Sequence, residues 1–136
     1  CMIVLDASAV AQIVFGSREG DAFRELMLEG EKSIAPDLVR SELANVFWKY
    51  HQAGMLERKD AQVRLSEAIS LIDEIHPSDD LVVEAFNEAV RLNHSAYDML
   101  YLVLARRTGS TLFTLDKELQ EACLETGVDC VTSTRL

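Results

Sequence analysis

The sequence predicts a three-layer α/β/α sandwich, with helices on both faces of a central parallel sheet of about five strands. Two observations carry this prediction. Short apolar runs alternate with longer segments of helical periodicity, and acidic residues follow two of the apolar runs. With only two prolines and six glycines, the chain contains no low-complexity linker. We therefore expect one domain over residues 1–136, with Met2 as the natural start and Cys1 as a remnant of cloning.

The strands are expected where short apolar runs are bounded by polar or turn residues. The first, "MIVL", is the clearest, and "TLFT" gives the fourth. The second and third are shorter and rest on "SIA" and "DEIH". In chain order, the predicted strands are residues 2–5, 33–35, 73–76, 111–114 and 129–132.

The helices are expected where apolar residues recur every three or four positions. One follows Asp6, and the remainder span residues 20–30, 36–54, 57–72, 78–93, 95–107 and 116–127. Gly54, Gly109 and Gly127 stand where helices commonly end. In "HPSDD", Pro77 marks a turn and Ser78 is expected to cap the next helix.

Composition excludes several classes of protein. The net charge of −10 argues against nucleic-acid binding through bulk charge. No C-x-x-C pair suggests a zinc site, so Cys123 and Cys130 are interpreted as reduced core residues. No apolar run reaches the roughly 18 residues of a membrane span, and no signal-peptide pattern is present. We therefore expect a cytoplasmic protein.

Two aspartates come directly after predicted strands. Asp6 follows "MIVL", and Asp116 follows "TLFTL". Each would serve as a helix cap, because aspartate readily accepts backbone N–H bonds. The carboxyl ends of parallel strands meet at one edge of a sheet, where ligands of such folds bind. We therefore expect these two carboxylates to lie near each other.

Glu42 lies on the apolar face of the helix predicted over residues 36–54, between Leu38 and Val46. An unpaired buried carboxylate is costly, so we expect that a cation meets Glu42, that its side chain reaches the rim, or that an arginine or lysine pairs with it. Arg40 and Lys49 are expected to point elsewhere on this helix. Asn45 borders the same face and could position Glu42 or a ligand.

Asp98 opens the strongly apolar helix predicted over residues 95–107. Ser95 and Asp98 fit a capping box, which alone would explain the aspartate. Asp98 nevertheless shares its helix face with Leu102 and Ala105, so it also points inward.

One hypothesis covers all four acids: a carboxylate cluster that holds Mg²⁺ or Mn²⁺ at the strand ends. Hard cations prefer oxygen ligands, and clustered carboxylates without a cation repel one another. Ser8 and Thr114 would add hydroxyl groups beside Asp6 and Asp116. Arg18 and Lys117 follow the first and fourth strands and are the basic residues that we expect to flank this site.

The segments that carry these residues resemble a PIN domain, specifically a VapC-type toxin ribonuclease. The similar stretches are "MIVLDASA", "PDLVRSELANVFWK", "SAYDMLYLVLARRTGSTLFTLD" and the closing strand, in the order of the family. Its pattern has an Asp after the first strand near a Ser or Thr, a Glu within a helix, an acid opening a later helix, and a final T-x-D. The matching residues are Asp6, Ser8, Glu42, Asp98, Thr114 and Asp116. Some members have a further acid nearby, for which only Glu118 would be available, and we leave it unassigned.

The resemblance implies RNA phosphodiester hydrolysis with Mg²⁺ or Mn²⁺. Asp6 and Asp98 would bind the metal directly, while Glu42 and Asp116 would bind it directly or through water. Ser8, Asn45 and Thr114 would support them. The resemblance also implies a VapB-type antitoxin and a homodimer. Candidates for such a contact surface are Trp48 and Tyr50, with Met55 and Leu56 beyond them.

Two other functions are compatible with the residues. The first is a PIN-like binding or regulatory domain without catalysis, which the presence of all four acids disfavours. The second is a phosphohydrolase with Asp6 as its nucleophile. Haloacid dehalogenase-like phosphatases would place a second aspartate where Ser8 stands, so this alternative is weaker.

Overall fold

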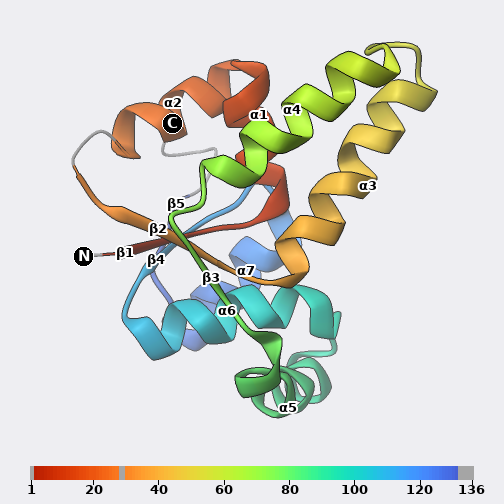
Figure 1. Ribbon diagram of the computed structural model, residues 1–136. Helices are drawn as coiled ribbons and strands as arrows, with labels where there is room; N and C mark the ends of the chain where they lie inside the picture. The colour runs from red at the N-terminus through yellow and green to blue at the C-terminus, as the bar shows by residue number, and fades with distance from the viewer. Residues whose placement is uncertain (1, 28–29, 132–136) are drawn as a thin grey trace.

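The computed structural model describes residues 2–27 and 30–131, and within these a parallel sheet forms the centre of the molecule (Figure 1). Every strand pair is parallel, in the order β3-β2-β1-β4-β5. The strands are β1 (Met2–Leu5), β2 (Lys32–Pro36), β3 (Glu74–His76), β4 (Thr111–Phe113) and β5 (Cys130–Val131). The predicted sheet is therefore confirmed, although residue 132 of its last expected strand lies outside the described residues.

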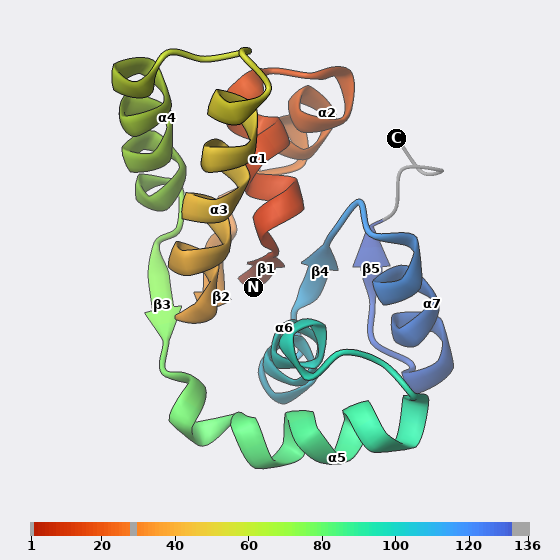
Figure 2. The ribbon, with the colours of Figure 1, turned by 90° about the vertical axis from the view of Figure 1, so that its right-hand side faces the viewer.

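Helices cover both faces of the sheet, which confirms the α/β/α prediction. Helices α1 to α4 lie on one side, and α5 to α7 lie on the other, with α5 packed on α6 (Figures 1 and 2). No helix of the described part is long and apolar enough to cross a membrane. The helices are α1 (Ala7–Phe15), α2 (Arg18–Met27), α3 (Leu38–Gln52), α4 (Arg58–Ser70), α5 (Val82–Leu92), α6 (Ala96–Thr108) and α7 (Lys117–Thr126).

Three helix starts differ from the prediction by two residues or more, and one of them is α3, which begins at Leu38 because Pro36 still belongs to β2. The second helix begins earlier than expected, because the Ser17 hydroxyl accepts the Gly20 N–H at 3.1 Å. Its last predicted residues, 28–29, lie outside the described part. Ser78 does not cap a helix. Its hydroxyl donates to the Asp37 carboxylate, so residues Ser78–Asp80 form a 3₁₀ turn and α5 starts at Val82.

The edge of the sheet where β1 and β4 end is the part of the fold that positions a site. In the sheet, β2 and β3 lie on one side of β1, and β4 and β5 lie on the other. The strand order therefore reverses between β1 and β4, and open α/β sheets bind ligands at such a topological switch point. Leu5 pairs with Phe113, and the Asp6 N–H donates to the Phe113 carbonyl at 3.3 Å. The residues after these strands, Asp6 and Thr114, are therefore held side by side.

Helix α1, which starts at this edge, is held in place by a close approach of α2. Gly20 lies so near the α1 backbone that an added Cβ would stand 1.9 Å from the Gln12 carbonyl oxygen. Only glycine permits this contact between the two helices.

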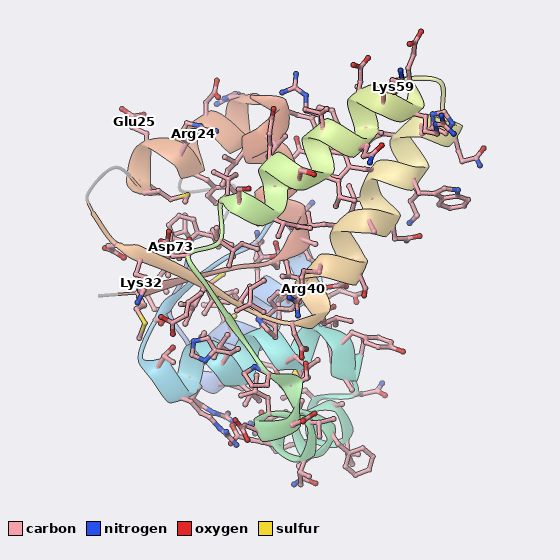
Figure 3. The ribbon with its side chains drawn as sticks, in the orientation of Figure 1. Arg24, Glu25, Lys32, Arg40, Lys59 and Asp73 are labelled. Atoms are coloured by element: carbon pink, nitrogen blue, oxygen red, sulfur yellow. The ribbon has the colours of Figure 1, made fainter. Side chains whose placement is uncertain are left out.

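Replacing Gly20 with alanine should force α1 and α2 apart and lower the free energy of unfolding by about 3 kcal/mol or more, as overpacking does. Chemical denaturation measures the loss. Glu25→Ala is the matched control, because Glu25 is an exposed residue of the same helix (Figure 3), and it should change stability by less than about 0.5 kcal/mol. Equal stability of the two variants would contradict the contact.

Candidate active site

The Asp6 carboxylate joins three segments of the chain. Its Oδ1 accepts the Ser8 hydroxyl at 2.7 Å and the Ala9 N–H at 2.9 Å, so Asp6 caps α1 as predicted for an isolated aspartate. Its Oδ2 accepts the Thr114 hydroxyl from the end of β4. Asp6 thus connects β1, α1 and β4, and its position is fixed by all three.

Burial changes the acidity of Asp6. Asp6 is only 6% exposed, and burial away from water raises the pKa of its carboxyl group to about 6. Hydrogen bonds from Thr114, Ala9 and Ser8 act in the opposite direction, and the Asp98 charge adds to the rise. Asp6 therefore carries a charge near neutral pH at an energetic cost that a bound cation would offset.

Glu42 finds a partner that is neither arginine nor lysine. The buried Tyr101 hydroxyl, from α6, donates to Glu42 Oε1 at 2.5 Å. Burial raises the pKa of Glu42, and this hydrogen bond partly opposes the rise. Burial also raises the pKa of Tyr101, so its phenol stays protonated and keeps donating. Of the alternatives for Glu42, pairing with an arginine or lysine is therefore not found among the described residues, and a neutral donor leaves the negative charge of Glu42 in place.

Asp98 is not explained by the predicted capping box. The Ser95 hydroxyl accepts the Tyr97 N–H at 3.1 Å, but within the described residues Asp98 makes no hydrogen bond back to Ser95. The Asp98 carboxylate lies 3.7 Å from Nδ1 of His94. Burial, followed by the negative charge of Asp116, raises the pKa of Asp98 to about 6.

Asp116 both caps a helix and faces the other acids. Its carboxylate accepts the Glu118 and Leu119 N–H groups at 2.9 and 3.2 Å, at the start of α7. Its own N–H donates to the Thr114 hydroxyl at 3.0 Å. Thr114 therefore links Asp116 to Asp6 from beneath.

One cavity of about 440 Å³ brings the four acids together. It opens between α3 and the start of α6, at the sheet edge described above. Most of the residues proposed from the sequence line it, while Thr114 is fully buried behind Asp6. No three Asp, Glu, His or Cys side chains in the described part converge closely enough, as they stand, to hold a metal ion. The residues predicted from the sequence that line this cavity are Asp6, Ser8, Glu42, Asn45, Asp98 and Asp116.

The cavity wall also contains residues that the sequence interpretation missed. Tyr97, Tyr101 and Lys49 line it, whereas the expected Arg18 and Lys117 do not. The signal for Lys49 was available: it follows Glu42 by seven residues, about two helical turns, and so shares its face. The expectation that Lys49 points elsewhere was wrong. Tyr101 depends on how α6 packs opposite α3, which local sequence does not specify.

A larger cavity of about 900 Å³ lies elsewhere, over α1, α2 and α4. Arg24 and Lys59 are among its lining residues, and Figure 3 shows them on the helices of this side. None of the four acids borders it. Chemistry rather than size therefore selects the smaller cavity as the candidate active site.

Comparisons with known proteins agree with this fold. The family model of the PIN domain matches residues 3–124. Ribonuclease VapC3 of Pyrobaculum aerophilum is 28% identical over 121 residues, which are 88% of this chain and 92% of that protein. The crystal structure of PAE2754 from Pyrobaculum aerophilum gives a TM-score of 0.70 at 24% identity, covering 89% of this chain and 84% of that one. VapBC2 from Rickettsia felis, solved with a promoter DNA fragment, gives 0.69 at 16% identity, covering 97% and 98%.

The raised pKa of Asp6 predicts a pH-dependent stability in metal-free buffer. Folded Asp6 keeps its proton up to about pH 6, whereas its ordinary pKa is 3.8, so the folded state binds more protons between these values. Raising the pH through this window should destabilise wild type. From about pH 4 to about pH 7, Asp6→Asn should gain stability relative to wild type by about 3 kcal/mol, at 1.36 kcal/mol per pKa unit.

Urea denaturation across this pH range measures the effect. Asp79→Asn, which replaces an exposed acid outside the cavity, is the control and should keep a constant difference from wild type. A constant difference for Asp6→Asn as well would contradict the buried, proton-retaining carboxyl.

Removing the Tyr101 hydroxyl should raise the pKa of Glu42 further, because the hydrogen bond that stabilises its charged form is lost. Tyr101→Phe keeps the buried ring, so the chain should fold, and carboxyl NMR titration reports the pKa of Glu42. The pKa of Asp37, which lies outside the cavity, should stay unchanged and serves as the internal reference. An unaltered pKa of Glu42 would show that the contact is absent in solution.

Proposed function

The chain belongs to the PIN domain family, and on that basis we propose that it is a metal-dependent endoribonuclease, the toxin of a VapBC-type pair, which hydrolyses RNA phosphodiester bonds. The observation that carries the proposal is the meeting of Asp6, Glu42, Asp98 and Asp116 in one cavity, from positions spread along the chain. The similarity to a protein named Ribonuclease VapC3, over most of both chains, supports the choice of RNA as substrate.

The residues fit a hard divalent cation such as Mg²⁺ or Mn²⁺. All four acids offer oxygen ligands, and a cation would offset both the burial and the repulsion from Asp116 that raise the pKa of Asp98. We assign Asp6 and Asp98 as direct ligands, with Glu42 and Asp116 binding directly or through water. This division suits Mg²⁺, which usually keeps several of its waters.

When bound, the metal would neutralise charge on the reacting phosphate and lower the pKa of water. The chain's own residues prepare this chemistry. The hydroxyl groups of Ser8 and Thr114 and the Ala9 N–H hold the Asp6 carboxylate in one orientation. Glu42, held by Tyr101 and with a raised pKa, is placed to take a proton inside the cavity. Asn45 can donate to a phosphate oxygen from the same wall.

The remaining partners follow from the same proposal. A VapB-type antitoxin and a second copy of the chain are the expected protein partners, and the cytoplasm is the expected location. Of the four residues predicted for a contact surface, Trp48 is 55% and Met55 63% exposed, whereas Leu56 packs partly against the core. Tyr50 instead packs its ring against Phe15 and accepts a bond from Gln12. Exposed apolar side chains suited to a protein contact also lie on α5, namely Val82, Val83, Phe86 and Val90.

The chain should cleave RNA in the presence of Mg²⁺ or Mn²⁺ and lose this activity in EDTA. Asp6→Asn should lower the cleavage rate by at least about 100-fold, because a proposed direct ligand is removed. Saturating Mg²⁺ should raise the melting temperature of wild type by about 5–10 °C and that of Asp6→Asn by much less. Gel assays of labelled RNA and thermal melts provide the two measurements.

Asp79→Asn is the control in both assays, since it removes an exposed acid outside the cavity. It should leave the cleavage rate and the metal-induced shift unchanged. Cleavage that survives both EDTA and Asp6→Asn would overturn the metal-site proposal.

A further inference from the structure

Among the described residues that line the cavity, Lys49 is the only basic one, and it shares the space with four acids. Lys49 is exposed, and within the described residues its ammonium group forms neither an ion pair nor a hydrogen bond. It lies on the same face of α3 as Glu42 and Asn45, about 10 Å beyond Glu42 along the helix axis. The wall thus presents a free positive charge beyond the acids.

Tyr97 stands on the opposite wall, in the first turn of α6 and next to Asp98. It is 66% exposed, and in the part of the chain that the structure describes it has no ring–ring contact. Its backbone is fixed by the Ser95 cap, so the ring projects from a rigid position. A large exposed aromatic ring at the mouth of a cavity that also holds four acids is suited to cover an apolar face of a ligand, such as a nucleobase.

We propose that Lys49 and Tyr97 bind the RNA strand on the two sides of the acid cluster. Lys49 pairs with a backbone phosphate, and Tyr97 stacks on the base of a nucleotide beside the scissile bond. This assignment rests on the proposed ribonuclease function and concerns substrate binding rather than the chemical step. Two local contacts of this kind would also let a protein with a net charge of −10 bind RNA without an extended basic surface.

The two contacts predict different responses. Tyr97→Leu should raise KM about tenfold with little change in kcat, and Tyr97→Phe should retain wild-type KM because the ring is kept. Lys49→Gln should also raise KM, and it should reduce the slope of log KM against log salt concentration by about 0.7, the value for one phosphate contact on a single strand. Tyr97→Leu should leave this slope unchanged.

Matched controls separate these effects from general ones. Arg40→Gln removes a positive charge from α3 outside the cavity, and Phe86→Leu removes an exposed ring from α5. Neither should alter KM or the salt slope. Thermal melts of all variants should match wild type, because the replaced side chains are exposed.

The experiment uses the full chain with Mg²⁺ and an unstructured RNA strand, and it also uses this strand annealed to its complement. Stacking on Tyr97 needs an unpaired base, so annealing should slow wild type markedly but Tyr97→Leu far less. Wild-type KM and salt slope in Tyr97→Leu and Lys49→Gln would overturn this inference while leaving the nuclease intact. A wild-type chain that cleaves no RNA would instead overturn the proposed function, and the inference with it.

Discussion

The hydrogen bonds received by the Asp6 carboxylate form the constraint on which the rest of the site depends. They tie the end of β1, the first turn of α1 and the end of β4 to one buried group. The Thr114 hydroxyl, which donates to Asp6, also accepts the Asp116 N–H. This second hydrogen bond positions Asp116, which caps the start of α7. These polar contacts thus fix the relative positions of two strands and two helices at this edge. The donors are neutral, so they satisfy the Asp6 carboxylate without cancelling its charge.

Stability and activity place opposite demands on this edge. Burial raises the pKa values of Asp6, Glu42 and Asp98, so each carboxylate costs the folded chain free energy when it ionises. An arginine or lysine paired with Glu42 would remove part of this cost. It would also neutralise the negative charge of Glu42, which would then attract a cation less strongly. The chain instead uses the Tyr101 hydroxyl, which positions the carboxylate and leaves it negative. The site therefore holds buried carboxylates whose ionisation is costly, which is a common property of functional sites.

The sequence was sufficient for the layers, the strands and the placing of acids at strand ends, because apolar periodicity and strand polarity are local properties. It was sufficient for Glu42 as well, since a charge on an apolar helix face stands out. It was insufficient for Tyr101, which is 59 residues from Glu42 and meets it only through packing across the sheet edge. Lys49 was wrongly predicted to point away from Glu42. The two residues are seven positions apart, which is about two helical turns, so they share one helix face. Ser78 fits a capping pattern, but a tertiary bond to Asp37 takes its hydroxyl.

The bond between Thr114 and Asp6 joins residues 108 positions apart, and this separation matters while the chain is being made. A ribosome releases the N-terminal end first, so Asp6, α1 and β1 emerge long before β4 is available to pair with them. Until then Asp6 lacks the Thr114 hydroxyl, and Glu42 lacks Tyr101, which is also made late. The four acids cannot assemble before β4 and Asp116 have emerged. Translation itself thus delays the moment at which a cell that makes this protein contains a complete site.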